Sequence, residues 1–266
     1  MEYEHLLIDA QGPTLWVTMN RPERLNALNP RLVDELRHLF TDLYWKKDVR
    51  VVVLKGAGRG FCAGLDLKDR TDGSNAKRSV SDGLTGQRKI SEIVMAMRRC
   101  PQPIISCVHG PASGGGFALA LASDVRIGTP TTRMNAAFIR IGLSACDIGV
   151  SYFLPRMIGA SGASEFMLTG RFIDATRGRE LGLLASVVEE SELEKEARGF
   201  VKDMLHATPL GLRLTKDALN HAIDAQSLEA AIAMEDRNQI LAAQGEDFAE
   251  GVAAFLEKRE PHYSGD

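Results

Sequence analysis

Two glycine-rich segments are the part of this sequence whose residue types point most directly to chemistry. Residues 58–64 and 110–116 each follow a short apolar run, at 51–54 and 104–108, and so leave the end of a predicted strand, where α/β folds place ligands. Glycine lets another group approach the main chain, whose N–H groups then need an acceptor. Two N–H groups that converge on one oxygen form an oxyanion hole, in which one donor stabilises developing negative charge by about 3 to 4 kcal/mol.

The same glycines permit other interpretations. Residues 58–63, Gly-Arg-Gly-Phe-Cys-Ala, fit the dinucleotide-binding pattern G-x-G-x-x-A. In dinucleotide-binding proteins this pattern opens an amphipathic helix. Here the chain runs on into the polar segment 70–79, which is predicted to be a mobile loop. No Gly-Lys-Ser/Thr follows either glycine segment, which excludes a phosphate-binding P-loop. Glycines that serve only tight turns would explain one such segment more readily than two at strand ends.

The elements that must position these segments are indicated by hydrophobic spacing. Residues 14–19 alternate polar and apolar as a strand does, and 51–54 is a continuous apolar run typical of a strand buried on both faces. Between them, Asn29 is a good N-cap with Pro30 at the first helical position. Apolar residues then recur at helical spacing: Leu32, Val33, Leu36, Leu39, Phe40 and Leu43. The pattern predicts a strand, helix, strand crossover.

Further along the chain, short strands are predicted over 104–108 and 125–127, with a helix over 117–122 between them. From about Glu192 the pattern becomes helical only, with a break at Pro209. The later helical stretches fall near 210–223, 227–242 and 246–257. We therefore expect a mixed α/β fold, with a core over residues 1–191 and a helical C-terminal region over 192–266.

Bulk composition is that of an ordinary globular protein. The 266 residues are 44% hydrophobic and 25% charged, with a net charge of −3, and no apolar run approaches the roughly 20 residues of a membrane-spanning helix. We expect no nucleic-acid partner, no membrane partner and a cytoplasmic location, because no basic patch or targeting segment is recognised. No metal is predicted, because the cysteines lack zinc-ligand spacing: Cys62, Cys100, Cys107 and Cys146.

Several ordered motifs together resemble the enoyl-CoA hydratase/isomerase (crotonase) family. They are Gly-Phe-Cys-Ala-Gly-Leu-Asp-Leu at 60–67, Gly-Pro-Ala-Ser-Gly-Gly-Gly at 110–116 and Ala-Ser-Asp-Val-Arg at 122–126. The likeness begins at 20–28 and ends at 248–259, and so spans nearly the whole chain. Motifs in this order are far more specific than a single glycine loop.

The resemblance implies a crotonase-like spiral of ββα units and a helical C-terminal region that builds a homotrimer or homohexamer. It implies an acyl-CoA thioester as the partner, with coenzyme A part of the substrate and no separate cofactor, and an oxyanion hole from the backbone N–H groups of Leu65 and Gly115. Residues implied to line the acyl-CoA path are Glu23, Arg24, Asn26, Ala63, Leu65, Asp66, Leu67, Lys68, Gly115, Phe138, Phe255 and Lys258. Core packing of Phe255 and a solvated helix end at Lys258 are equally good interpretations of those two residues.

The sequence departs from a hydratase of this family at both acid/base positions. Such hydratases use two glutamates that divide the acid and base roles, and the matching positions here hold Ala118 and Phe138. Neither side chain can move a proton. One positioned acid or base is worth about 10²- to 10⁴-fold in rate, so hydration is expected to be slow unless another group substitutes.

Asp147 is the nearest candidate for such a group. It matches the place where dienoyl-CoA isomerases and 4-chlorobenzoyl-CoA dehalogenases of this family carry an active aspartate. The dehalogenases also need a histidine upstream of Pro103, where this chain has Met95 and Met97. Apolar neighbours raise the pKa of a carboxyl group and suit it to act as a base near neutrality. The alternative is a turn or N-cap aspartate before a helix that starts around Gly149.

Three classes of function stay open at this point. The first is an acyl-CoA enzyme in which the oxyanion hole stabilises an enolate and Asp147 is the catalytic acid/base; a CoA-thioester isomerase or hydrolase belongs to this class. The second is a non-catalytic acyl-CoA-binding protein that has kept the pocket and lost the chemistry. The third is a nicotinamide oxidoreductase built on residues 58–63.

Overall fold

The protein is built on two β-sheets. The computed structural model describes residues 1–68 and 79–265, so most of the expected polar loop, 70–78, lies outside the described residues. The larger sheet has the order β1-β2-β3-β4-β6-β9, and β5, β7 and β8 form the smaller one. Only β1 runs antiparallel to its neighbour in the larger sheet as described. The strands are β1 (Leu6–Gln11), β2 (Thr14–Met19), β3 (Val51–Gly56), β4 (Ile104–Val108), β5 (Pro111–Ser113), β6 (Val125–Gly128), β7 (Arg133–Asn135), β8 (Ile173–Asp174) and β9 (Ser186–Val187).

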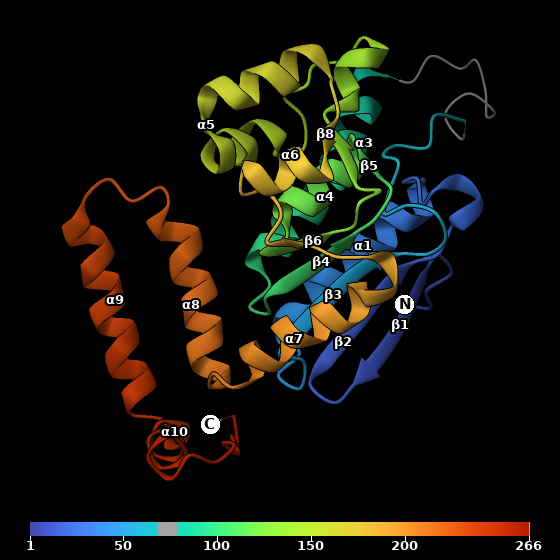
Figure 1. Cartoon of the computed structure of the whole chain (residues 1–266). Helices are drawn as coiled ribbons and strands as arrows, with labels where there is room; N and C mark the ends of the chain where they lie inside the picture. Colours follow the sequence, from blue (N-terminus) through green and yellow to red (C-terminus); the bar gives the residue numbers. More distant parts are fainter. Residues whose placement is uncertain (69–78, 266) are drawn as a thin grey trace.

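Helices connect the strands and cover the larger sheet on both sides (Figure 1). The α-helices are α1 (Pro30–Asp42), α3 (Val80–Arg99), α4 (Gly115–Ala122), α5 (Val150–Thr169), α6 (Ala175–Glu180), α7 (Leu193–Leu205), α8 (Pro209–Ala222), α9 (Leu228–Ala243) and α10 (Glu246–Glu257). Short 3-10 helices are η1 (Pro22–Arg24), η2 (Leu43–Trp45), η3 (Ala137–Ile141) and η4 (Glu190–Glu192). None of the described helices is long and apolar enough to cross a membrane.

The chain winds as a spiral in which a strand of the larger sheet is followed by a strand of a second layer. β4 leads into β5 and β6 leads into β7, and Cys62, which follows β3, bridges to Ala112 of β5. Helix α4 then returns the chain to the larger sheet at β6. The predicted spiral of ββα units is therefore confirmed.

The predicted crossover from β2 through α1 to β3 is also confirmed. The Asn29 side chain accepts a hydrogen bond from the Leu32 N–H at 2.9 Å and caps α1, with Pro30 in its first turn. Alternate residues of β3 face opposite layers, because Val52 packs with α1 and α4 whereas Val53 packs with α7. Burial of both faces explains why the sequence there is apolar without alternation.

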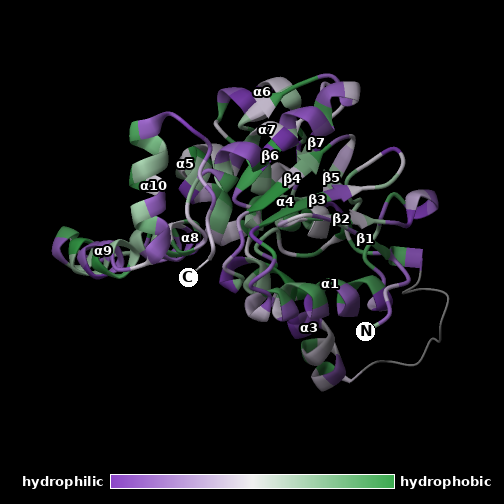
Figure 2. Ribbon diagram, turned by 90° about the horizontal axis from the view of Figure 1, so that it is seen from below, coloured by the Kyte–Doolittle hydropathy of each residue, from purple (hydrophilic) through white to green (hydrophobic). Residues whose placement is uncertain are grey.

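Four α-helices follow the last strand, and α8, α9 and α10 extend away from the sheets as an arm (Figure 1). Their bounds agree closely with the predicted stretches. Helix α7 instead packs on the outer face of the larger sheet through Leu193, Ala197 and Val201. In Figure 2 the arm helices carry hydrophobic turns among hydrophilic ones, and no residue of α9 is buried. The division at 191 and 192 stays a prediction, because the first helix beyond it belongs to the packed body.

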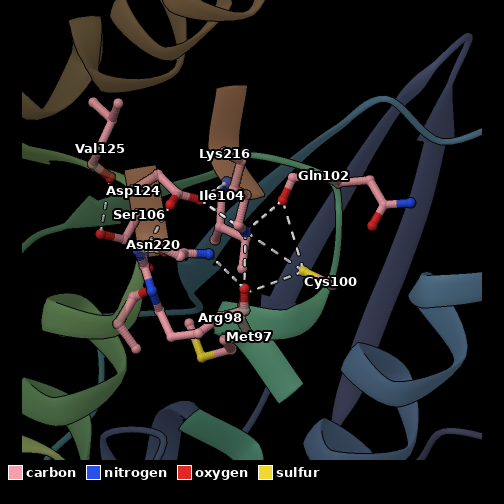
Figure 3. Close-up of polar contacts among 12 residues, drawn as sticks. Met97, Arg98, Cys100, Gln102, Ile104, Ser106, Asp124, Val125, Lys216 and Asn220 are labelled. Carbon is pink, nitrogen blue, oxygen red and sulfur yellow. Dashed lines mark hydrogen bonds and ion pairs between the residues drawn. The ribbon is translucent and has the colours of Figure 1, made fainter. Parts of the chain in front are cut away.

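A buried lysine attaches the arm to the body (Figure 3). Lys216 of α8 donates to the carbonyl oxygens of Met97 at 3.1 Å and Gln102 at 2.7 Å, and its ammonium lies 2.9 Å from the Asp124 carboxylate. Asp124 also pairs with Arg98 of α3 at 2.8 Å. These contacts hold α8 against the C-terminal half of α3.

Candidate active site

The two glycine segments meet in one frame of main-chain hydrogen bonds. The Cys62 N–H donates to the Pro111 carbonyl at 3.1 Å, and the Ser113 N–H donates to the Cys62 carbonyl at 3.0 Å. Gly116 packs so closely on this frame that an added Cβ would lie 2.0 Å from the Cys62 carbonyl oxygen. Only glycine fits there, because real Cβ atoms do not approach that closely. The segments therefore sit in a fixed relation to each other.

The N–H groups of Leu65 and Gly115 lie at the centre of this frame. The Leu28 N–H donates to the Gly64 carbonyl, and the Asp66 N–H donates to the Leu28 carbonyl. In this parallel bridge the Leu65 N–H points away from Leu28. Gly115 is the first residue of α4, where helix N–H groups have no intrahelical partner. Within the described part of the chain, neither of these two N–H groups reaches an acceptor.

The two N–H groups come from segments that touch. Gly64 has a φ of 94°, and a Cβ built on it would lie 3.3 Å from the Gly115 nitrogen. Leu65 and Gly115 line one cavity of about 110 Å³. Its remaining walls are mainly apolar: Leu28, Ala63, Leu67, Ile90, Phe138, Ile141, Leu143 and Ile148. Hydrogen bonds formed in such apolar surroundings are stronger than in water.

Asp147 lines the same cavity as Leu65 and Gly115. Its Oδ1 accepts hydrogen bonds from the Gln87 side-chain amide at 2.5 Å and from the Ile148 N–H at 2.8 Å. Asp147 is half-buried, and it is not the N-cap of the next helix: that position is Gly149, and no side chain caps α5 there. The N-cap interpretation of Asp147 is therefore wrong, whereas the turn interpretation is confirmed: the Val150 N–H donates to the Asp147 carbonyl at 2.9 Å and closes a turn over residues 147–150.

Gln87 is a site residue that the sequence reasoning missed. It lies on α3 and lines the cavity together with Ile90. Its position three residues before Ile90 and seven before Val94 puts it on one face of a helix, which is the only signal that could have pointed to it. That signal does not reveal which residue it faces.

The two positions that hold glutamate in family hydratases have different settings. Ala118 lies inside α4 with no exposed surface. Phe138 of η3 forms part of the cavity wall, and a Cβ added to Gly114 would lie 3.4 Å from its ring. The ring of Phe138 therefore gives this side of the cavity an apolar wall.

The residues predicted near coenzyme A fall into two groups. Asn26 has no exposed surface; its side chain donates to the carbonyls of Ala57 at 2.9 Å and Gly60 at 2.8 Å and accepts from the Arg21 N–H at 2.8 Å. Asp66 is buried and pairs with Arg21 at 3.0 Å. Both side chains thus hold the loops in place. Glu23, Arg24, Ala63, Leu67 and Lys68 are exposed or half-buried.

Phe255 and Lys258 are not brought to the cavity within one chain. Phe255 is 84% exposed on α10, which lies in the arm (Figure 1), and Lys258 is the C-cap residue of that helix with a φ of 54°. The core-packing interpretation of Phe255 is wrong for the single chain. A contact of either residue with coenzyme A stays a prediction.

Two buried residues near the glycine segments, His109 and Cys62, have structural roles. The His109 ring lies 2.8 Å from the Gly58 carbonyl through Nε2, and the side chain is 6% exposed. Burial raises the pKa of the Cys62 thiol to about 12, against the smaller opposing effects of the Gly64 N–H and Arg21. Cys62 is therefore a protonated core residue and not a nucleophile near neutral pH.

Comparison with known proteins assigns the whole chain to one family. The enoyl-CoA hydratase/isomerase family model matches residues 10–266. A Mycobacterium tuberculosis protein named as a probable enoyl-CoA hydratase is 36% identical over 253 residues, which cover 94% of this chain and 89% of that protein. The 1,2-epoxyphenylacetyl-CoA isomerase of Escherichia coli is 33% identical over 98% of this chain and 99% of its own.

Solved structures agree with this assignment. The enoyl-CoA hydratase from Bacillus anthracis superposes with a TM-score of 0.92 at 31% identity, over 99% of this chain and all of the other. The enoyl-CoA hydratase from Mycobacterium smegmatis superposes with a TM-score of 0.89 at 30% identity, over 97% of this chain and 98% of the other. The likeness extends through the helical arm as well as the sheets.

Proposed function

This chain belongs to the enoyl-CoA hydratase/isomerase family, and we propose that it binds an acyl-CoA thioester with the carbonyl oxygen between the N–H groups of Leu65 and Gly115. The proposal is supported by the two N–H groups that line one cavity without an acceptor in the described chain. Removal of a proton from the acyl chain leaves an enolate whose negative charge lies on that oxygen. Two preorganised donors stabilise this charge by about 3 to 4 kcal/mol each.

Asp147 is the group that moves the proton in this proposal. The single observation that carries it is the presence of its carboxylate in the same small cavity as the two N–H groups. The amide of Gln87 and the N–H of Ile148 both donate to Oδ1 and fix the direction of the carboxylate. A base in this place can take a C–H proton as the electron pair moves toward the thioester oxygen.

Double-bond isomerisation is the reaction that one acid/base serves best. The proton that Asp147 removes from one carbon returns to another carbon of the same enolate, so no water and no second group are needed. Hydration requires a group to activate water and a group to protonate carbon, and Phe138 and Ala118 supply neither. The similar proteins include one named as an isomerase, 1,2-epoxyphenylacetyl-CoA isomerase, beside others named as probable enoyl-CoA hydratases.

The experiment is a panel of enoyl-CoA thioesters followed by ultraviolet absorbance, with wild-type protein and Asp147→Asn. We expect turnover in the wild type and a loss of about 10²- to 10⁴-fold in the variant, which keeps the shape of the side chain but cannot accept a proton. Asp9→Asn, at an exposed position on β1, is the matched control and should turn over normally. Full turnover in Asp147→Asn would overturn the role of Asp147.

A non-catalytic acyl-CoA-binding protein is the second candidate, because two acid/base positions hold Ala118 and Phe138. Calorimetric titration with CoA and with saturated acyl-CoA separates the two. Binding without turnover on any enoyl-CoA supports the second candidate. Absence of binding contradicts both.

A further inference from the structure

A second, larger hollow lies next to the candidate active site, between α3, α5 and α8. Its volume is about 540 Å³, compared with about 110 Å³ for the thioester cavity. Aliphatic side chains from all three helices line it: Val94, Met95, Met157, Leu219 and Ile223. Hollows of roughly 300 to 1,000 Å³ are those in which proteins bury small organic ligands. The thioester cavity has about a fifth of the volume of the larger hollow.

Ile148 is the residue that lines both hollows. On one side its Cδ1 lies 3.7 Å from where a Cβ on Gly115 would be. On the other side the adjoining Gly149 lies close to both α3 and α5. A Cβ added to Gly149 would lie 3.4 Å from Val94 and 2.8 Å from Phe153. The Ile148 side chain therefore forms the wall between the thioester cavity and the larger hollow.

The backbone at this wall is strained. Ile148 has a φ of 36°, in the left-handed region that a β-branched residue rarely adopts, and the residue is 9% exposed. Such a conformation persists only where the surroundings impose it, and it occurs preferentially at functional sites. A glycine at this position would adopt the same backbone without strain.

Four arginines line the larger hollow, and each of them takes part in an ion pair. Arg98 pairs with Asp124 at 2.8 Å, and Arg156 pairs with Asp224 at 3.1 Å. Arg88 and Arg99 share Glu92, and Arg98 shares Asp124 with Lys216, so the charged groups keep a positive excess. The walls between these groups are aliphatic and suit a hydrocarbon chain. The contacts of Lys216 and Asn220 with α3 (Figure 3) hold the α3 and α8 walls together, so the hollow is preformed.

From these observations we propose that Ile148 determines the acyl-chain length of this protein. An aliphatic acyl chain that runs from the thioester carbonyl ends at Ile148 in the wild type. The hollow between α3, α5 and α8 receives the distal methylenes of a longer chain once the Ile148 side chain is removed. The inference rests on the proposed function, because it needs a thioester between Leu65 and Gly115.

The test is calorimetric titration with CoA, butyryl-CoA, octanoyl-CoA and dodecanoyl-CoA. In the wild type the affinity should rise from CoA to butyryl-CoA and then stay level. In Ile148→Gly it should keep rising, by up to about fourfold for each further methylene that is buried. Ile148→Ala is the second variant. It should open a narrower passage to the hollow, so affinity should also rise with chain length, but less steeply than in Ile148→Gly. Leu168→Ala, at a 76% exposed position on α5 outside both hollows, should keep the wild-type profile.

A variant that adds bulk to the hollow tests whether the acyl chain enters it. Leu219 is 63% exposed and lines the hollow from α8, so Leu219→Trp adds bulk there without entering the core. Combined with Ile148→Gly, it should restore the level profile. A gain that survives Leu219→Trp would overturn the assignment of the hollow.

The outcomes also separate this inference from the proposed function. No binding of butyryl-CoA by the wild type contradicts the proposed function itself. Binding of butyryl-CoA with the same chain-length profile in wild type, Ile148→Gly and Ile148→Ala overturns the role of Ile148 alone. Continued strengthening up to dodecanoyl-CoA in the wild type overturns it as well.

Discussion

Single residues decide what chemistry the pocket can perform. In the proposed function, Leu65 and Gly115 contribute only main-chain N–H groups, so their backbone positions matter more than their side chains. Asp147 is the carboxylate that shares their cavity, and Phe138 gives the same cavity an apolar wall. This combination suits transfer of one proton within a substrate rather than addition of water.

Gln87 should position Asp147 for that transfer. Gln87→Ala removes the amide that donates to Asp147 Oδ1 at 2.5 Å, and hydrogen bonds to charged groups contribute about 1.5 to 3 kcal/mol. We expect kcat on the best enoyl-CoA to fall by about 10- to 10²-fold while KM changes little. A rise in KM at constant kcat would instead make Gln87 a substrate-binding residue. Gln244→Ala, at the C-cap of α9, is the control.

Gly116 should be indispensable to the frame that holds both N–H groups. Gly116→Ala would bring a Cβ to 2.0 Å from the Cys62 carbonyl, a backbone atom that cannot move aside. Overpacking of this kind destabilises by about 1 to 3 kcal/mol, measurable as a lower urea midpoint. Gly199→Ala on α7 meets no atom within 4 Å and should stabilise the protein by about 1 kcal/mol. Equal midpoints for the two variants would contradict the account.

Some of the candidate site residues could be predicted from the sequence and others could not. Asp147 was found because its position along the chain matches an acidic position of the family. Gln87 and Ile148 were not, because a polar residue on a helix or an apolar residue in a loop acquires its role only from what packs against it. The strained φ of Ile148 has no signal in sequence at all.

Elements were more predictable than side-chain partners. The cap and proline of α1, the unbroken apolar run of β3 and the helical spacing after Pro209 depend on local chemistry that is visible in sequence. The placement of η3, which brings Phe138 over Gly114, depends on packing between distant segments. The attachment of α8 to α3 is a tertiary feature of the same kind.

Lys216 should hold α8 to the body. Its side chain is 4% exposed, so Lys216→Ala leaves the buried carbonyls of Met97 and Gln102 without this donor, while Asp124 keeps Arg98. We expect the free energy of unfolding in urea to fall by about 2 to 3 kcal/mol, because buried acceptors that lose a charged donor are left unsatisfied. Lys195 pairs with Glu192 and its side chain is 81% exposed. Lys195→Ala should therefore change the free energy of unfolding by less than about 1 kcal/mol. A similar small effect for both would show that Lys216 carries no anchoring role.

The arm of the molecule exposes several apolar side chains on α9. Leu228, Ile232, Ile240 and Leu241 on α9 are all exposed. Exposed apolar patches of this extent mark interaction surfaces. We therefore propose that the arm forms contacts between copies, as a homotrimer or homohexamer, which would also give Phe255 and Lys258 of one copy a neighbour. A cytoplasmic location stays an expectation from the sequence.

Light scattering coupled to size-exclusion chromatography checks this assembly. We expect a mass of three or six chains of 29.0 kDa each. Ile240→Asp places a charge on the 61% exposed α9 position and should lower the mass toward a single chain while far-ultraviolet circular dichroism stays unchanged. Wild-type protein that elutes as a monomer at micromolar concentration would contradict the proposed role of the arm.

The central claim is that a thioester carbonyl lies between the N–H groups of Leu65 and Gly115. Infrared difference spectroscopy of a bound acyl-CoA labelled with ¹³C at the thioester carbonyl tests it most directly, because two converging donors weaken the C=O bond. We expect the carbonyl stretch of the bound thioester at a lower frequency than that of the same thioester in water. A bound thioester whose carbonyl stretch equals or exceeds the frequency in water would contradict it.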